Sequence, residues 1–215
     1  MDRSNIVERI IQEGVVGVIR MDDSKNLLKV AEAILKGGIS LLEITMTTPN
    51  ALQVIEICSK EMGREMLIGV GSVLDSETAR LAIMAGAKYV VSPVTNKAVI
   101  QTAHRYDVPV IPGAFTPTEI QVASELGADI VKVFPADVVG MAFFKAVKTP
   151  MPHVNLMPTG GVSLTNAGDW LKSGACAVGV GSALLDKKAI AEHNFKALTE
   201  NARTLCASIA SSRNS

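Results

Sequence analysis

The feature that most constrains the fold is a regular alternation of short apolar runs with amphipathic stretches along all 215 residues. Eight apolar runs have the length and the Val and Ile content of buried strands. They are residues 15–20, 41–46, 67–72, 89–93, 108–113, 129–135, 154–160 and 177–182. Stretches with helical spacing separate them, at residues 24–37, 50–62, 75–85, 97–106, 117–126, 141–148, 164–173 and 188–209.

This alternation predicts parallel strands joined by right-handed crossovers. Eight such units predict an α/β fold with one domain over residues 1–215, a single (β/α)8 TIM barrel. An open doubly wound sheet is the alternative that the pattern leaves. Residues 3–13 form an extra N-terminal helix that could close the bottom of the barrel, and we expect the small, polar tail at 208–215 to fray.

Glycine placement supports a single closed unit. A glycine precedes every second strand, at Gly38, Gly86, Gly127 and Gly174. Glycine at that position supplies the left-handed conformation that ends a helix and turns the chain into the next strand. The repeating unit is therefore a pair of strand–helix units, which favours one barrel over two domains.

Composition narrows the function classes. The formal net charge is zero and the pI is near 6.8, so no basic excess points to nucleic acid or to an anionic membrane. No apolar run is long enough to span a bilayer, and residues 1–13 lack the features of a signal peptide. The three cysteines are odd in number and lack metal spacing, so we expect reduced thiols in a cytoplasmic protein.

Lys132 interrupts the apolar run at residues 129–135. Buried parallel strands are apolar on both faces, so a charged residue within one is informative. Alternation along the strand puts Lys132 on one face with Ile130 and Phe134. Burial favours the uncharged amine, which is the form that attacks a ketone. The other interpretation is a lysine whose amine reaches solvent at the strand end.

The run at residues 41–46 is polar on one face, because every second residue from Glu43 to Thr47 is polar and those between are apolar. We expect the polar face to line the interior and the apolar face to contact helices. Glu43 can then transfer protons, or form a structural ion pair with Lys132. An inward lysine and an inward glutamate in one barrel favour Schiff-base chemistry over the structural pair.

Glycine-rich ends follow the seventh and eighth strands, at Gly160–Gly161 and Gly181–Ser182. Phosphate sites in (β/α)8 barrels commonly form at these two ends. Glycine lets backbone N–H groups approach a phosphate, and Ser182 adds a hydroxyl donor. Each end alone could be a tight turn, but the two together favour phosphate.

Metal and serine-hydrolase chemistry find no support in the sequence. The histidines His104, His153 and His193 are scattered and show no ligand spacing. No G-x-S-x-G elbow is present. We therefore expect no metal and no cofactor.

Seven ordered segments together resemble the 2-keto-3-deoxy-6-phosphogluconate (KDPG) and 4-hydroxy-2-oxoglutarate (KHG) aldolase family. The resemblance extends over about residues 5–205. The segments are 41–49 (LLEITMTTP), 69–75 (GVGSVLD), 91–93 (VSP), 111–119 (IPGAFTPTE), 131–136 (VKVFPA), 158–162 (PTGGV) and 179–184 (GVGSAL).

The resemblance implies a metal-free class I aldolase, usually a homotrimer. It implies that Lys132 forms the Schiff base, that Glu43 is the acid and base, and that the two glycine-rich ends hold phosphate. Contacts to the keto acid and its carboxylate would come from Arg20, Thr47, Ser72, Pro93, Phe134 and Thr159. Two positions depart from the pattern: Thr47 stands where some members have an arginine, and Ser72 stands where threonine is common. Both departures concern substrate binding rather than the reaction class.

The resemblance thus implies an aldolase that cleaves KDPG to pyruvate and glyceraldehyde 3-phosphate, and that also cleaves KHG to pyruvate and glyoxylate. Three alternatives stay open: an aldolase of the same family for the galactonate epimer, a phosphosugar isomerase or synthase on the same scaffold, and an inert phosphosugar-binding barrel. The expected ligand is a small phosphorylated keto acid.

Overall fold

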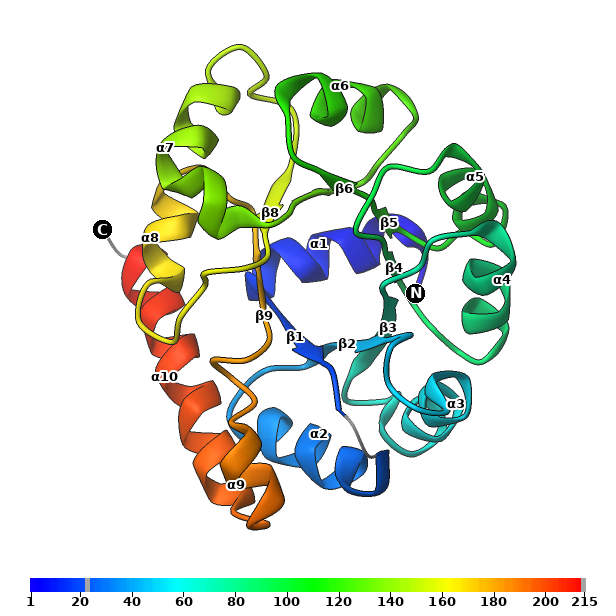
Figure 1. The fold of residues 1–215 in the computed structure, drawn as a ribbon, viewed down its shortest axis with the longest axis vertical. Coiled ribbons are helices and arrows are strands. Elements are labelled where there is room, and N and C mark those ends of the chain that lie inside the picture. The colour runs from blue at the N-terminus through cyan, green and yellow to red at the C-terminus, as the bar shows by residue number, and fades with distance from the viewer. Residues whose placement is uncertain (22–23, 214–215) are drawn as a thin grey trace.

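Among the residues that the structure describes, nine short parallel strands form two sheets that curl around a common interior (Figure 1). The computed structural model describes residues 1–21 and 24–213. One sheet has the order β5-β4-β3-β2-β1-β9 and the other has the order β6-β7-β8. The strands are β1 (Val15–Ile19), β2 (Leu41–Thr45), β3 (Leu67–Gly71), β4 (Val90–Val91), β5 (Val110–Ile111), β6 (Gly113–Ala114), β7 (Val131–Val133), β8 (Leu156–Pro158) and β9 (Val178–Val180). The predicted α/β class and parallel order are confirmed.

The two sheets approach each other at both of their edges. Only Pro112 separates β5 from β6, and proline has no N–H to donate to a neighbouring strand. Its carbonyl still accepts a hydrogen bond from the Lys132 amide at 2.9 Å. At the other edge, isolated parallel bridges join Leu156 to Ala175 and Thr159 to Gly179, next to β8 and β9.

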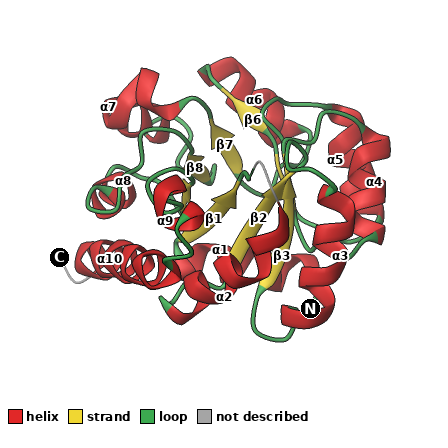
Figure 2. Ribbon diagram, turned by 60° about the horizontal axis from the view of Figure 1, so that its bottom comes forward, coloured by secondary structure: helices red, strands yellow, loops and turns green. Residues whose placement is uncertain are grey.

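Helices cover the outer side of the strands (Figures 1 and 2). They are α2 (Leu27–Lys36) after a 3-10 turn (Ser24–Asn26), α3 (Ala51–Met62), α4 (Ser76–Met84), α5 (Lys97–Arg105), α6 (Pro117–Glu125), α7 (Ala136–Lys148), α8 (Ala167–Lys172), α9 (Lys187–Ala191) and α10 (Phe195–Arg213). The predicted helix at 188–209 is two helices, because His193 takes a φ of 54° and breaks the run. The predicted helix at 141–148 begins earlier, at Ala136, with non-helical backbone at Gly140.

The predicted glycine turns are confirmed. Gly38, Gly86, Gly127 and Gly174 have φ values of 102°, 110°, 92° and 103°, which is the left-handed region. They precede β2, β4, β7 and β9, the second, fourth, sixth and eighth of the predicted strand runs.

Side chains separate into two apolar clusters, one on each side of the strands. The inner cluster faces α1 (Arg3–Glu13), which crosses the centre of the ring of strands in Figure 1. Its buried members are Ile6, Ile10, Val16, Leu41, Leu67, Tyr89, Val91, Ile111, Ile130, Met157 and Ala177. Leu42 and Ile44 belong to the outer cluster under the helices. Alternation along β2 is therefore as predicted, and α1 closes one end of the interior.

The expectation that the chain frays from residue 208 is wrong for residues 208–213, which continue α10. The Ser208 hydroxyl donates to the Thr165 carbonyl at 3.0 Å and accepts from the Gly168 amide at 3.1 Å. Arg213 donates to the Ile11 carbonyl at 2.9 Å, which ties α10 to α1. Residues 214–215 lie outside the described residues. Within the described part of the chain, no helix is long and apolar enough to cross a bilayer.

Candidate active site

Lys132 points into the interior from β7. Its neighbours Val131 and Val133 belong to the outer cluster and Ile130 to the inner one, as alternation requires. Lys132 is 6% exposed. Gly113 lies opposite it in register on β6, so no side chain fills the space beside the amine from that strand. Lysine is seldom this buried, because the loss of water around its amine costs free energy unless another interaction offsets it.

Glu43 points into the same interior from β2 and is 1% exposed. Its carboxylate occupies the place where a side chain at Gly71 would be, so the glycine of β3 makes room for it. The Oε2 atom has no hydrogen-bond partner among the described residues. A buried carboxylate oxygen without a partner is rare in a structural role, because leaving it unpaired costs free energy.

The charges of two nearby cations affect the pKa of Glu43. Burial raises the pKa of the Glu43 carboxyl, and the charges of Lys132 and then Arg20 oppose that rise. The net direction is upward from the ordinary value of 4.5. A raised pKa brings the titration of the carboxyl closer to neutral pH, which suits an acid–base catalyst.

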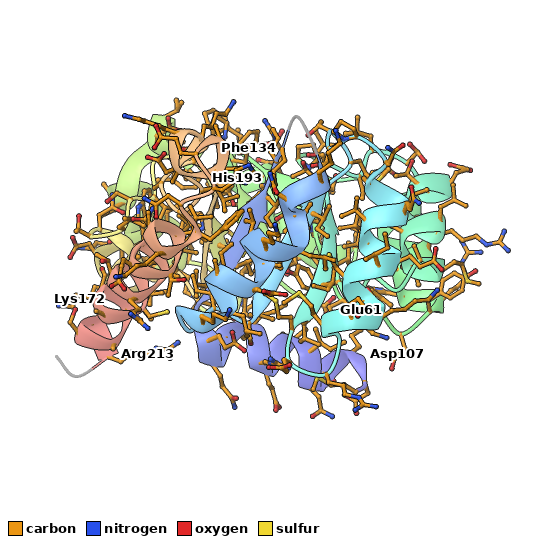
Figure 3. All side chains as sticks on the ribbon, turned by 90° about the horizontal axis from the view of Figure 1, so that it is seen from below. Glu61, Asp107, Phe134, Lys172, His193 and Arg213 are labelled. Atoms are coloured by element: carbon orange, nitrogen blue, oxygen red, sulfur yellow. The ribbon has the colours of Figure 1, made fainter. Side chains whose placement is uncertain are left out.

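The site opens at the end of the strands opposite α1. Phe134 follows β7, and its ring centroid is 5.0 Å from the Lys132 amine. Figure 3 shows Phe134 at the end of the molecule away from α1. A pocket of about 520 Å³ adjoins it, lined by Pro93, Gly113, Phe134 and side chains of α6. Lys132 and Glu43 are not among the residues that line this pocket, so it flanks the amine at the open end of the strands and does not enclose it.

Hydroxyl groups surround the end of β2. Thr47 is exposed, and its hydroxyl lies 2.9 Å from that of buried Thr45. Ser72 follows β3 with a φ of 60°, a left-handed conformation that is uncommon for serine and typical of functional loops. Arg20 is exposed just after β1, and its charge reaches Glu43. The end of β2 thus offers neutral donors beside one cation.

The two glycine-rich ends are adjacent. The bridge between Thr159 and Gly179 brings the end of β8 beside β9. Gly160 and Gly161 have φ values of 98° and 70°, and a Cβ on Gly161 would lie 2.6 Å from the Cβ of Asp137, so both positions require glycine. The Thr159 hydroxyl is buried and has no partner among the described residues.

The turn after β9 is the second of the two glycine-rich ends. Gly181 follows β9 directly, and its carbonyl accepts hydrogen bonds from the Leu184 and Leu185 amides at 3.0 and 2.9 Å. Ser182 is exposed at the start of that turn. The Ser182 hydroxyl is thus on an exposed turn directly after β9, the strand that is bridged to Thr159.

One interior group was not among the predicted site residues. Tyr89 is fully buried, directly before β4, and its hydroxyl has no partner among the described residues. Its ring lies over Gly69, and Gly69 is paired in register with Glu43 of β2. Alternation along residues 89–93 predicts that Tyr89 shares a face with Pro93, but it does not relate Tyr89 to Glu43. Among residues 1–21 and 24–213, no three His, Cys, Asp or Glu side chains are grouped as metal ligands.

Comparison with known proteins gives a consistent result. The sequence model described as "KDPG and KHG aldolase" matches residues 6–201. A 2-dehydro-3-deoxy-phosphogluconate aldolase of Haemophilus influenzae is 32% identical, over 88% of this chain and 90% of that protein. A KHG/KDPG aldolase of Escherichia coli is 32% identical, over 91% of this chain and 92% of that protein.

Solved structures agree. KDPG aldolase of Legionella pneumophila, with pyruvate captured as a covalent carbinolamine, is 29% identical and superposes with a TM-score of 0.86, covering 93% of this chain and 97% of that chain. A cube-shaped cage designed by fusing symmetric oligomeric domains is 26% identical, with a TM-score of 0.87, covering 94% of this chain and 73% of that chain.

Proposed function

This chain belongs to the KDPG and KHG aldolase family, and from that premise we propose that it is a class I aldolase that splits KDPG into pyruvate and glyceraldehyde 3-phosphate. The observation that carries the proposal is the pairing of buried Lys132 with buried Glu43 in one interior. The covalent carbinolamine in the Legionella relative supports an amine as nucleophile.

Lys132 begins the reaction. In its uncharged form the amine attacks the C2 ketone of the substrate, and the resulting carbinolamine takes up a proton from solvent and loses water to give an iminium ion. Glu43, as the carboxylate, removes the proton of the C4 hydroxyl. The C3–C4 bond then breaks, its electrons form an enamine on the lysine side, and the aldehyde leaves. Protonated Glu43 returns its proton to C3, and water hydrolyses the iminium ion to free pyruvate and the amine.

The two ends of the substrate have different partners in this proposal. The pyruvate end lies against Phe134 and Pro93, and its carboxylate is held by Thr47, Ser72 and Arg20. This arrangement uses neutral donors and one cation in place of an arginine at position 47. No metal and no cofactor takes part, because the iminium ion on Lys132 is the electron sink.

The phosphate end lies over the adjacent ends of β8 and β9. Its partners in this proposal are Gly160, Gly161, Ser182 and Gly181, with the Thr159 hydroxyl toward the middle of the substrate. Fixing both ends orients C2 at the amine and the C4 hydroxyl at Glu43, which supplies much of the rate enhancement of a positioned reaction.

We also propose that residues 1–215 form one domain in which β5 and β6 are halves of one strand, so that eight strands close a (β/α)8 barrel. The single proline between the halves and the bridges beside β8 and β9 support this closure. A cytoplasmic homotrimer is the proposed working form. The symmetric oligomeric domains of the similar cage support an oligomer.

The substrate is tested by kinetics with KDPG, its galactonate epimer and KHG side by side, with pyruvate measured through lactate dehydrogenase. We expect KDPG to give the highest kcat/KM and KHG a lower one. A preference for the galactonate epimer would assign the other specificity of the family. The mechanism is tested by borohydride reduction with pyruvate.

In that experiment pyruvate becomes attached to Lys132, as mass spectrometry of peptides will show, and Lys132→Ala gains no label. Lys97→Ala, which removes an exposed lysine from α5, is the matched control and remains labelled. Full turnover by Lys132→Ala, or label at another lysine, would reject the assignment. Ligand binding with neither label nor pyruvate release would instead indicate an inert binding protein.

A further inference from the structure

Tyr89 is an unusual residue for its position, which is the apolar part of the interior that packs against α1. It is 0% exposed and belongs to the inner cluster with Leu41, Leu67 and Ile10, where phenylalanine would pack equally well. Its hydroxyl has no hydrogen-bond partner among the described residues. Burying a hydroxyl without a partner is unfavourable, so a phenol at this position needs a compensating interaction.

Glu43 can supply such an interaction, because its charge acts on the Tyr89 phenol. Glu43 is paired with Gly69 in register, and the Tyr89 ring lies over Gly69 with its Cε2, Cζ and Cδ2 atoms closest. The ring therefore extends across the strand that separates it from β2. Glu43 Oε2 is also a buried polar atom without a hydrogen-bond partner in the described residues. The Tyr89 ring lies over Gly69 and the Glu43 carboxylate lies at Gly71, two residues further along the same face of β3. The two unpaired atoms can therefore serve as donor and acceptor.

We propose that Tyr89 is a positioning residue for Glu43, and that its hydroxyl is linked to Oε2 through one ordered water. The hydroxyl donates to the water and the water donates to the carboxylate, which satisfies both atoms and fits the usual role of buried water. This inference rests on the proposed function, because it assigns Tyr89 a part in setting the proton transfers of Glu43.

The charges around the pair fix the direction of the donation. Burial, then the charges of Glu43 and of Glu13 at the end of α1, raise the pKa of the Tyr89 phenol, so it stays protonated and can only donate to an anion. Glu43 is faced by Lys132 from β7, by Arg20 after β1 and by Tyr89, whereas β3 presents only glycines to it. A donor from Tyr89 therefore stabilises ionised Glu43 and opposes the effect of burial.

The kinetic test is Tyr89→Phe, which removes only the hydroxyl. We expect kcat/KM on the acidic side of the pH profile to fall about threefold to tenfold, with a smaller loss at high pH, because Glu43 needs a higher pH to ionise. Labelling of Lys132 by pyruvate and borohydride stays complete. Tyr106→Phe, at the exposed end of α5, is the control and keeps the parental profile. A Tyr89→Phe profile that superimposes on the parental one would overturn the proposal.

A second test does not depend on catalysis. The urea midpoint of unfolding is measured for Tyr89→Phe, Glu43→Gln and the double variant at neutral pH. We expect the shift caused by Tyr89→Phe to be smaller in the Glu43→Gln background, and equal shifts would reject the link. If the protein did not cleave KDPG, this cycle would still report on the pair, so the two proposals fail separately. A crystal structure with no water between the two groups would also overturn the inference.

Discussion

The carboxylate of Glu43 occupies the space that a side chain at Gly71 would fill. The two residues are on neighbouring strands, with Gly71 paired in register with Thr45. The absence of a side chain at Gly71 leaves the space that the carboxylate fills. The position of the proposed acid–base group is therefore set by a glycine as much as by the glutamate itself.

Gly71→Ala tests that relationship. The added methyl would overlap Glu43 Oε1, so the carboxylate must move. We expect kcat to fall about 100-fold, because even a small displacement of the carboxylate moves it out of position to take the proton of the C4 hydroxyl. We also expect destabilisation of about 1–3 kcal/mol from overpacking, measured by urea unfolding. Borohydride labelling of Lys132 should persist, and loss of labelling would mean that the methyl damages the nucleophile as well.

Glu43→Gln separates imine formation from cleavage. The amide keeps the shape of the side chain but cannot take the C4 hydroxyl proton. We expect pyruvate labelling to continue while KDPG cleavage falls about 10²- to 10⁴-fold. In the parent, the raised pKa of Glu43 means that activity declines at a higher pH than an ordinary glutamate would give, as pH falls through that pKa. A parental rate that stays flat down to the ordinary glutamate value of 4.5 would contradict this role.

The same substitution has an opposite effect on stability. Because the folded-state pKa of Glu43 is raised, the folded protein binds the proton more tightly than the unfolded chain does. Stability from this group is therefore complete below the ordinary value of 4.5 and is lost as pH rises toward the folded-state pKa. We expect Glu43→Gln to raise the urea midpoint at neutral pH, with the gain disappearing below pH 4.5. A lower midpoint at neutral pH would show that ionised Glu43 stabilises the fold.

Local periodicity accounts for what could be predicted from the sequence. Alternation along residues 41–46 and 129–135 is a property of the strands alone, and it was enough to turn Glu43 and Lys132 inward. The break at His193 was not predictable in the same way. It depends on a turn in which the Asn194 amide donates to the Ala189 carbonyl at 2.8 Å, and the amphipathic pattern runs through it.

Contacts between segments that are distant in the sequence could not be predicted from a local pattern either. The serine-rich end of α10 has the composition of a loose tail, but its small side chains let it approach Gly168 of α8 closely. The pattern at residues 89–93 predicts only an apolar strand. The proposed role of Tyr89 depends on its position relative to Glu43 across β3. Which strands are neighbours determines such relations, and this follows only from the assembled sheet.

Arg213→Ala tests the ordered end of α10. The Arg213 guanidinium donates to the carbonyls of Ile11 and Gln12 at the end of α1, groups that have no partner within the helix. We expect a loss of about 1 kcal/mol in thermal or urea unfolding, with unchanged kcat/KM. Arg203→Ala is the control, because that exposed arginine pairs with nearby Glu200 on the same helix, at 2.7 Å. Equal effects of the two substitutions would show that the tie to α1 is unimportant.

Ser182→Ala tests the proposed phosphate site through the difference between two substrates. KDPG carries a phosphate and KHG does not, so a hydroxyl that binds phosphate matters only for the former. Loss of a hydrogen bond to a charged group should raise the KM for KDPG about tenfold to a hundredfold. The KM for KHG should change less than twofold, roughly the effect of a surface substitution. Because Ser182 is exposed after β9, the fold should tolerate the change, and an equal rise in both KM values would place Ser182 outside a phosphate site.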